Sequence, residues 1–332
     1  MSGNHQGPVG LDVGTSRVVT ARREEDRYVY RAELNSFVAL PASKLTASVL
    51  QREKVPHSVE SDQIIVHGNE SEKFADLLEI ETRRPMRAGV INPSEAESLA
   101  MMRQIVTGIL GPAASPGQKV TFSIPAPPAG AQDNLTYHEA SLRQIVSELG
   151  YQPQSINEGL AVVYSEMEDS NFTGIGISLG GGLCNVCLAY LSVPVVSFSV
   201  PKAGDYIDSS AAAMTGDLAN RVRIAKENSF HYNGVFLEKT QQVLSVYYDE
   251  VIQGVVQALE REVGSSRSLP RLGRPLPLVL SGGSAIPKGF RERFEKFLSE
   301  SRFPVPVSSI RVANEPLYAT AKGALVAALS DL

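Results

Sequence analysis

Three glycine-rich turns carry the residue types that could hold an anion. They lie in residues 10–16 (GLDVGTS), 175–183 (IGISLGGGL) and 280–284 (LSGGS), and each follows an apolar run. Glycine tolerates positive φ and leaves backbone N–H groups open to a bound phosphate. Taken singly, each could be a tight turn that needs glycine only for its geometry. Three such turns spread along the chain predict one site assembled from two domains.

Two carboxylates stand at positions suited to chemistry. Asp12 lies on the strand before the first turn, where a carboxylate beside phosphates would hold Mg²⁺ through water. Glu158 lies where a strand end passes into an apolar helix, a position from which it could reach an interdomain cleft. The alternatives are an ordinary polar turn at Asp12 and an exposed first-turn glutamate favoured by the helix dipole at Glu158.

The composition favours an ordinary globular protein of two domains. The chain has 332 residues, 43% of them hydrophobic and 20% charged, and a formal net charge of -5. This charge, without a dense Lys/Arg block, argues against non-specific nucleic-acid binding. No apolar run has the length of a membrane span, and residues 1–8 form a polar lead unlike a signal peptide. We therefore expect a cytoplasmic protein without direct membrane insertion.

Two other motifs have plainer interpretations. Residues 176–180 match G-x-S-x-G, the serine-hydrolase elbow, but that elbow needs a helix after the serine, and here more glycine and a strand-like run follow. Cys184 and Cys187 are the only cysteines and lie in that run, where their side chains would point to opposite faces. We interpret them as buried structural thiols rather than a redox or zinc motif.

The remaining pattern predicts an α/β chain with a duplicated unit. Strand, glycine turn and strand occur at residues 9–21 and again at 175–190. A helix should begin at the Asn92 cap and run to Leu110, where Gly111 and Pro112 end it. Further strands are expected at 119–125, 193–200 and 278–280, further helices at 137–149, 217–230, 235–263 and 319–329 and after Pro287, and a surface loop at 265–277.

Five segments in order resemble the actin-like ATPase superfamily, which includes the sugar kinases and heat-shock chaperone ATPases. Residues 10–16 resemble its first phosphate loop and 178–183 its second. Residues 157–161, 281–289 and 314–324 resemble its first connecting segment, adenosine segment and second connecting helix. Residues 84–91 (RPMRAGVI) resemble bacterial actins of the MreB type, and residues 202–208 and 226–230 resemble those of the MamK type.

The resemblance implies an α/β, actin-like ATPase fold with two duplicated, RNase H-like lobes around a nucleotide cleft. The first lobe would span residues 1–150 with a small insert at about 34–84, and the second 151–332 with an insert at about 212–275. The C-terminal helix at about 319–329 would pack back on the first lobe. ATP or ADP with Mg²⁺ would be the cofactor, and the partners would be further copies in a filament and a protein cargo or adaptor.

The resemblance also implies a role for each candidate residue. Glu158 would orient the attacking water, and Asp12 would act beside the metal. The remaining candidates would bind the nucleotide: the phosphates by Gly14, Thr15, Ser16, Ser178, Gly180, Gly181 and Gly182, and the adenosine by Lys226, Gly282, Gly283 and Ser284.

Three positions depart from the family pattern. The second loop of the family reads Asp-x-Gly-Gly-Gly-Thr, whereas this chain has Ser178 and Leu183 at the ends of that motif, and Gly159 replaces a usual proline. A lost positioning contact can cost roughly 10²–10³ in rate while binding survives. The chain is thus either a filament-forming protein with slow ATP hydrolysis or a nucleotide-binding scaffold or switch with a non-hydrolysing site. A sugar or metabolite kinase is a third interpretation, with no acidic catalytic-base loop to support it.

Overall fold

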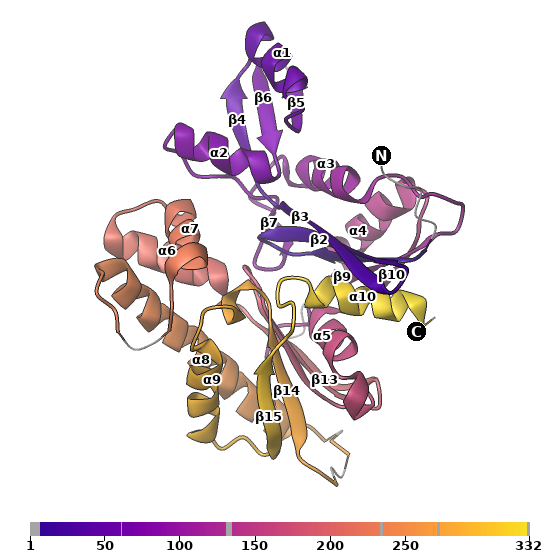
Figure 1. The fold of residues 1–332 in the computed structure, drawn as a ribbon, viewed down its shortest axis with the longest axis vertical. Coiled ribbons are helices and arrows are strands. Elements are labelled where there is room, and N and C mark those ends of the chain that lie inside the picture. The colour runs from indigo at the N-terminus through magenta and orange to yellow at the C-terminus, as the bar shows by residue number, and fades with distance from the viewer. Residues whose placement is uncertain are drawn as a thin grey trace.

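Two five-stranded sheets form the framework of the molecule (Figure 1). The computed structural model describes residues 7–60, 62–130, 135–232, 235–267, 269–270 and 273–330. The first sheet has the order β10 (Gln152–Asn157), β9 (Lys119–Ile124), β1 (Val9–Val13), β2 (Arg17–Glu24), β3 (Arg27–Leu34). The second has the order β13 (Val193–Val200), β12 (Cys184–Tyr190), β11 (Gly174–Leu179), β14 (Leu276–Ser281), β15 (Val307–Val312).

The two sheets have the same topology. In each, three antiparallel strands in chain order are followed by two strands that add in parallel at the other side. The first strand of each meander, β1 or β11, is central and almost wholly buried, which explains why its residues are mostly apolar or glycine. The predicted α/β fold with two duplicated lobes is confirmed.

Helices α5 (Glu158–Glu166) and α10 (Ala319–Leu329) pack together between the two sheets (Figure 1). Their approach is so close that a Cβ added at Gly323 would lie 1.7 Å from the carbonyl oxygen of Ala161. A Cβ at Gly159 would lie 2.6 Å from the backbone nitrogen of Cys187 on β12. The departure at Gly159 therefore has a packing reason, since no side chain fits there.

Two inserts extend the lobes toward the same side (Figure 1). The first has its own three-stranded sheet and small apolar core, and the second is built around α7 with α6 and α8. The elements of the first are β4 (Phe37–Pro41), α1 (Lys44–Arg52), β5 (His57–Glu60), β6 (Gln63–His67) and α2 (Asn69–Leu77). Those of the second are α6 (Gly204–Thr215), α7 (Ala219–Ser229) and α8 (Lys239–Ser265). The predicted boundaries of the lobes and inserts stay predictions.

The predicted helix starts at Asn92 and Val235 are wrong. Helix α3 (Ser98–Leu110) begins six residues after Asn92, because the Ser98 hydroxyl donates to the Asn92 carbonyl at 2.6 Å and residues 92–97 form turns. Helix α8 begins at Lys239, since Glu238 before it is extended. The other elements follow the prediction within a few residues, including α4 (Thr136–Glu148) and α9 (Phe290–Ser299), and a short hairpin joins β7 (Met86–Arg87) and β8 (Val90–Ile91).

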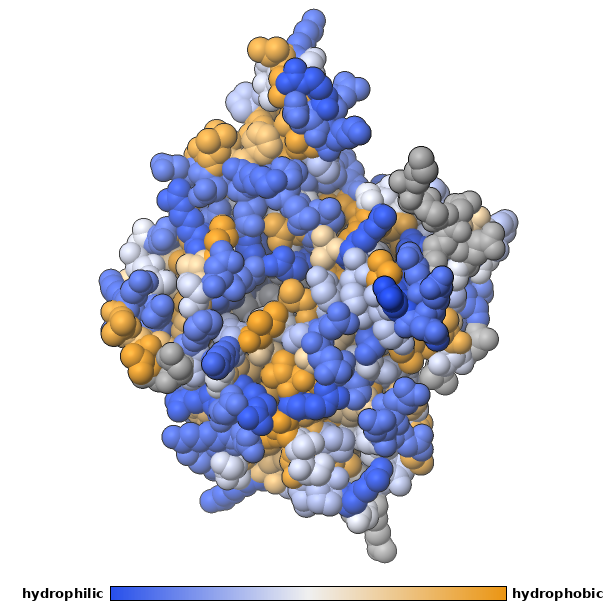
Figure 2. Space-filling model, in the orientation of Figure 1, coloured by the Kyte–Doolittle hydropathy of each residue, from blue (hydrophilic) through white to orange (hydrophobic). Residues whose placement is uncertain are grey.

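The face of the molecule shown in Figure 2 is largely hydrophilic, with apolar residues gathered near its middle. Within the described ranges, no helix combines the length and apolarity needed to cross a membrane.

Candidate functional site

The turns after β1 and β11 have the same geometry and touch one another. The Gly14 N–H donates to the Arg17 carbonyl at 2.9 Å, and the Gly180 N–H donates to the Leu183 carbonyl at 3.0 Å. A Cβ added at Gly182 would lie 2.3 Å from the hydroxyl oxygen of Thr15. A larger residue at Gly182 would therefore push the two lobes apart.

The third turn lies beside the second, because β14 runs parallel to β11. Gly282 has φ +88°, and a Cβ there would lie 2.3 Å from the Leu179 carbonyl oxygen. This position combines a left-handed backbone with a close approach, so it requires glycine. Gly283 and Ser284 follow in a short 3-10 helix.

One cavity of about 470 Å³ brings the candidate residues together. Its volume falls in the range of about 300–1,000 Å³ usual for small-molecule sites. Its lining includes all the sequence candidates: Asp12, Gly14, Thr15, Ser16, Glu158, Ser178, Gly180, Gly181, Gly182, Lys226, Gly282, Gly283 and Ser284. It also includes apolar residues at the end near the third turn, namely Phe230, Ile286, Pro287 and Leu317.

The two candidate carboxylates influence each other in one wall of the cavity. Ser123 Oγ donates to Asp12 Oδ1 at 2.6 Å, and Ser178 Oγ donates to Glu158 Oε2 at 3.3 Å. Burial raises the pKa of Asp12, with the Ser123 hydrogen bond opposing it. Burial and then the charge of Asp12 raise the pKa of Glu158, while Ser178 and Asn185 act in the opposite direction. A cation in this wall would relieve the repulsion between the pair.

Asp12 is compatible with Mg²⁺ held mainly by a nucleotide. Among the described residues there is no group of three or more His, Cys, Asp or Glu side chains that could hold a metal ion alone. Mg²⁺ often keeps several waters and is bound by one or two carboxylates together with substrate phosphates. The carboxylate of Asp12, beside the first turn, would be the protein part of such a site.

Leu183 belongs to the contact between the lobes. It is 9% exposed, and a Cβ added at Gly89 would lie 2.3 Å from its Cδ1 atom. The Gly89 N–H in turn donates to Thr15 Oγ1 at 3.0 Å. Leu183 and Gly89 are therefore complementary, and the departure at 183 is built into the packing.

Lys226 is held by a partner that the sequence reasoning missed. Its ammonium nitrogen lies 2.7 Å from Asp208 Oδ1, with both residues buried in the cavity wall. Burial raises the pKa of Asp208 to about 6, although the charge of Lys226 and its hydrogen bond oppose the rise. The local sequence places Asp208 on the same face of α6 as Asp205, but its pairing with Lys226 depends on how α6 and α7 pack.

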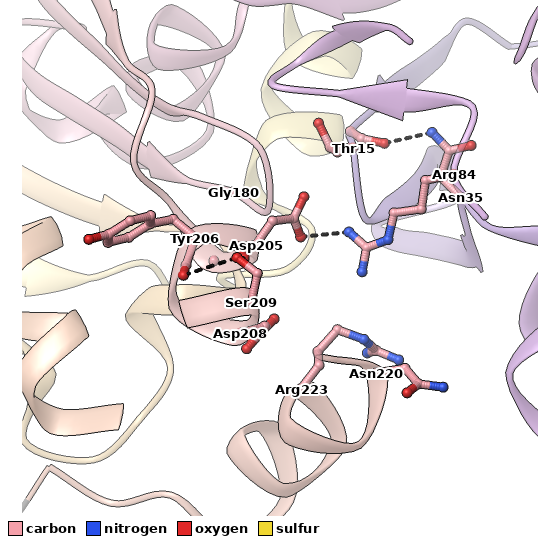
Figure 3. Close-up of polar contacts among 12 residues, drawn as sticks. Thr15, Asn35, Arg84, Gly180, Asp205, Tyr206, Asp208, Ser209, Asn220 and Arg223 are labelled. Carbon is pink, nitrogen blue, oxygen red and sulfur yellow. Dashed lines mark hydrogen bonds and ion pairs between the residues drawn. The ribbon is translucent and has the colours of Figure 1, made fainter. Parts of the chain in front are cut away.

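Ion pairs also join the first lobe to helices of the second lobe near the turns. Arg84 and Asp205 meet at 2.6 Å (Figure 3), and Arg17 and Glu227 meet at 2.5 Å. These two pairs tie the first lobe to α6 and α7. At the mouth, Arg223 on α7 pairs with Glu72 on α2. Sequence reasoning missed all six residues, since each pair joins segments far apart in the chain.

The interpretations of the other two motifs are confirmed. The glycines after Ser178 lead into strand β12, so the helix that a hydrolase elbow needs does not follow. Cys184 and Cys187 are free and buried, and they belong to different apolar clusters on the two sides of the sheet.

Comparisons with known proteins point to one family and one fold. The model of the Volactin family matches residues 8–328, and no functionally curated protein matches the chain. A structure of a MamK double helical filament superposes with a TM-score of 0.71, at 17% identity over 98% of both chains.

Two further structures have the same fold. MreB5 of Spiroplasma citri bound to AMPPNP has a TM-score of 0.68, at 15% identity over 97% of this chain and 96% of that one. The ethanolamine utilization protein EutJ from Carboxydothermus hydrogenoformans has a TM-score of 0.56, at 14% identity over 96% and 89%. The resemblance to the actin-like superfamily is thus confirmed at the level of the fold.

Proposed function

We propose that this protein, which belongs to the Volactin family, binds ATP or ADP with Mg²⁺ and assembles into filaments with slow ATP hydrolysis. The observation that carries the proposal is the convergence of three glycine turns, Asp12 and Glu158 on one cavity. Support also comes from the fold, which is that of MamK in a double helical filament and of MreB5 bound to ADP or AMPPNP.

In this proposal the two lobes hold the phosphates between their turns. The first lobe binds the phosphates through backbone N–H groups and the hydroxyls of Thr15 and Ser16. The second lobe binds them through Ser178 and Gly180–Gly182. Lys226 and the third turn, Gly282 to Ser284, receive the adenosine beside the apolar end of the cavity.

Hydrolysis would depend on the wall that holds the two carboxylates. Glu158 orients a water for attack on the γ-phosphate, and Ser178 donates to its carboxylate at 3.3 Å. Asp12 would hold Mg²⁺ through water, and the bound ion would neutralise charge on the phosphates. Because Ser178 brings no charge to the cation, we expect slow turnover.

The second candidate is a nucleotide-binding scaffold or switch that does not hydrolyse. It is favoured by Leu183, whose side chain packs on Gly89 and offers no hydroxyl to a phosphate or water. In both cases the partners would be further copies of the chain and a protein cargo or adaptor. We also propose a cytoplasmic location, without nucleic-acid binding or direct membrane insertion.

Filling part of the cavity should weaken nucleotide binding. A Cβ at Gly283 would lie 3.5 Å from the Leu317 side chain, an ordinary van der Waals contact, so the Gly283→Ile variant should fold. Its side chain should occupy the apolar end of the cavity, where the adenosine would bind. We expect Mg-ATP affinity, measured by titration calorimetry, to fall at least about tenfold, the effect of some 1.4 kcal/mol.

Gly108→Ile is the matched control, since a Cβ at that exposed position of α3 meets nothing within 4 Å. It should bind Mg-ATP as the unaltered chain does. Equal affinity of a folded Gly283→Ile variant, or no binding by the unaltered chain, would contradict the proposed site.

A further inference from the structure

A row of polar side chains crosses the second sheet from the cavity wall. Ser178, Asn185 and Ser199 are in register on β11, β12 and β13, so their side chains share one face. All three are buried, and Asn185 and Ser199 are fully so, at 0% exposure. The row begins at Glu158, which accepts from Ser178.

The other end of the row holds a segment of the first lobe. Residues 126–129, which follow β9, cross to the second sheet. Ser199 Oγ donates to the Ala126 carbonyl at 2.9 Å, and the Ala126 N–H donates to Asn185 Oδ1 at 2.8 Å. The row therefore connects the neighbourhood of Glu158 with backbone of the opposite lobe.

These contacts fix the orientation of the Asn185 amide. Its oxygen must face the Ala126 N–H, because only the oxygen accepts, so its NH₂ group is the free end. That nitrogen is buried and has no partner at hydrogen-bond geometry within the described part of the chain. The segment that carries Glu158 lies against the same strand, since a Cβ added at Gly159 would lie 2.6 Å from the backbone nitrogen of Cys187. Ser178, the cross-strand neighbour of Asn185, donates to the Glu158 carboxylate. The free amide end is therefore on the side of that carboxylate, and the Asn185 side chain opposes the rise in the pKa of Glu158 that burial and Asp12 cause.

We propose that Asn185 is a positioning residue, which holds the Glu158 carboxylate in the orientation needed for the attacking water. The inference rests on the proposed function, in which Glu158 orients that water. Because the same amide is fixed to Ala126, the orientation of Glu158 is linked to the segment that joins the lobes. A purely structural amide would serve only the Ala126 contact, and the two roles predict different effects of substitution.

Two substitutions at Asn185 separate these roles. Asn185→Leu removes the amide at similar volume, whereas Asn185→Asp keeps an oxygen for the Ala126 N–H and loses the donor toward Glu158. If Asn185 positions Glu158, both variants should release phosphate from Mg-ATP about 10–100-fold more slowly at pH 8, with affinity for Mg-ATP nearly unchanged. Rescue of the rate by Asn185→Asp would overturn the proposal in favour of a structural role.

Ser199→Ala is the matched control. It removes the other side-chain bond to Ala126 without touching Glu158, so its phosphate release should match that of the unaltered chain. A loss in Ser199→Ala as large as in Asn185→Leu would also overturn the proposal.

A second readout needs no hydrolysis. The titration of Glu158, followed by ¹³C NMR of labelled glutamate in nucleotide-free protein, should move to higher pH in Asn185→Leu, because a donor to the charged form is lost. Ser199→Ala should leave it unchanged, and Asp12, the charged group acting on Glu158, is present in every variant. A chain that binds no nucleotide would refute the proposed function, whereas an unmoved titration in Asn185→Leu would refute this inference.

Discussion

Glu158→Gln should lower the rate of phosphate release by about 10²–10⁴-fold, the usual contribution of a positioned acid–base group. The glutamine keeps the volume and a hydrogen bond to Ser178, but it replaces one carboxylate oxygen with an NH₂ group and so cannot orient the attacking water as the carboxylate does. Mg-ATP affinity should stay nearly the same, because the turns and not Glu158 hold the phosphates.

The same variant should be more stable than the unaltered protein at pH 8 without nucleotide and Mg²⁺. Burial and Asp12 raise the pKa of Glu158 above its ordinary 4.5, so the folded state favours the neutral acid. Stability from that neutral form is fully present below the ordinary pKa and is lost as pH rises through the raised one. Glutamine is neutral at every pH and escapes this loss.

Single-turnover phosphate release and thermal unfolding at pH 5 and pH 8 measure both effects. The melting temperature of Glu158→Gln should exceed that of the unaltered chain at pH 8 and converge with it toward pH 5. Unchanged phosphate release from Mg-ATP would refute the catalytic role of Glu158. An unchanged melting temperature at pH 8 would show that the charged form of Glu158 is not destabilised by burial and by Asp12.

Restoring the two residues of the family motif should raise hydrolysis. In Ser178→Asp with Leu183→Thr, a third carboxylate joins Asp12 and Glu158 and gives Mg²⁺ a further charged partner, and a hydroxyl returns at 183. We expect phosphate release to rise about 10²-fold, the size of one lost positioning contact.

The gain should carry a cost in stability. Leu183→Thr leaves space against Gly89, and the added carboxylate repels the existing pair, so the melting temperature without Mg²⁺ should fall. Added Mg²⁺ should restore part of it. Ser178→Asn with Leu183→Thr is the control, since it has the same shape without the charge, and it should show neither the faster phosphate release nor the Mg²⁺ effect. Equal rates in the two double variants would exclude charge at 178 as the limit on turnover.

Local sequence predicted the parts of the fold and site that depend on local chemistry. The glycine-rich turns could be found because close packing at Gly182 and a left-handed backbone at Gly282 leave glycine as the only fitting residue. The duplicated strands could be found from their largely apolar sequences before a glycine turn, and Asp12 and Glu158 from their places near strand ends.

What escaped prediction depends on contacts between distant segments. Lys226 was assigned to the adenosine, but its pairing with Asp208 depends on how α6 and α7 pack. Arg17 lies 210 residues from Glu227, and no local pattern encodes that pair. The start of α3 was missed because the Ser98 hydroxyl competes for the Asn92 carbonyl, a contact that propensity does not register.

The measurement that tests the central claim most directly is pelleting and light scattering with Mg-ATP, with Mg-ADP and without nucleotide, with released phosphate followed in parallel. We predict filaments that require nucleotide and form faster than phosphate is released, and no filaments from Gly283→Ile. A soluble monomer that binds Mg-ATP and does not assemble under any of these conditions would contradict the filament proposal and favour the switch.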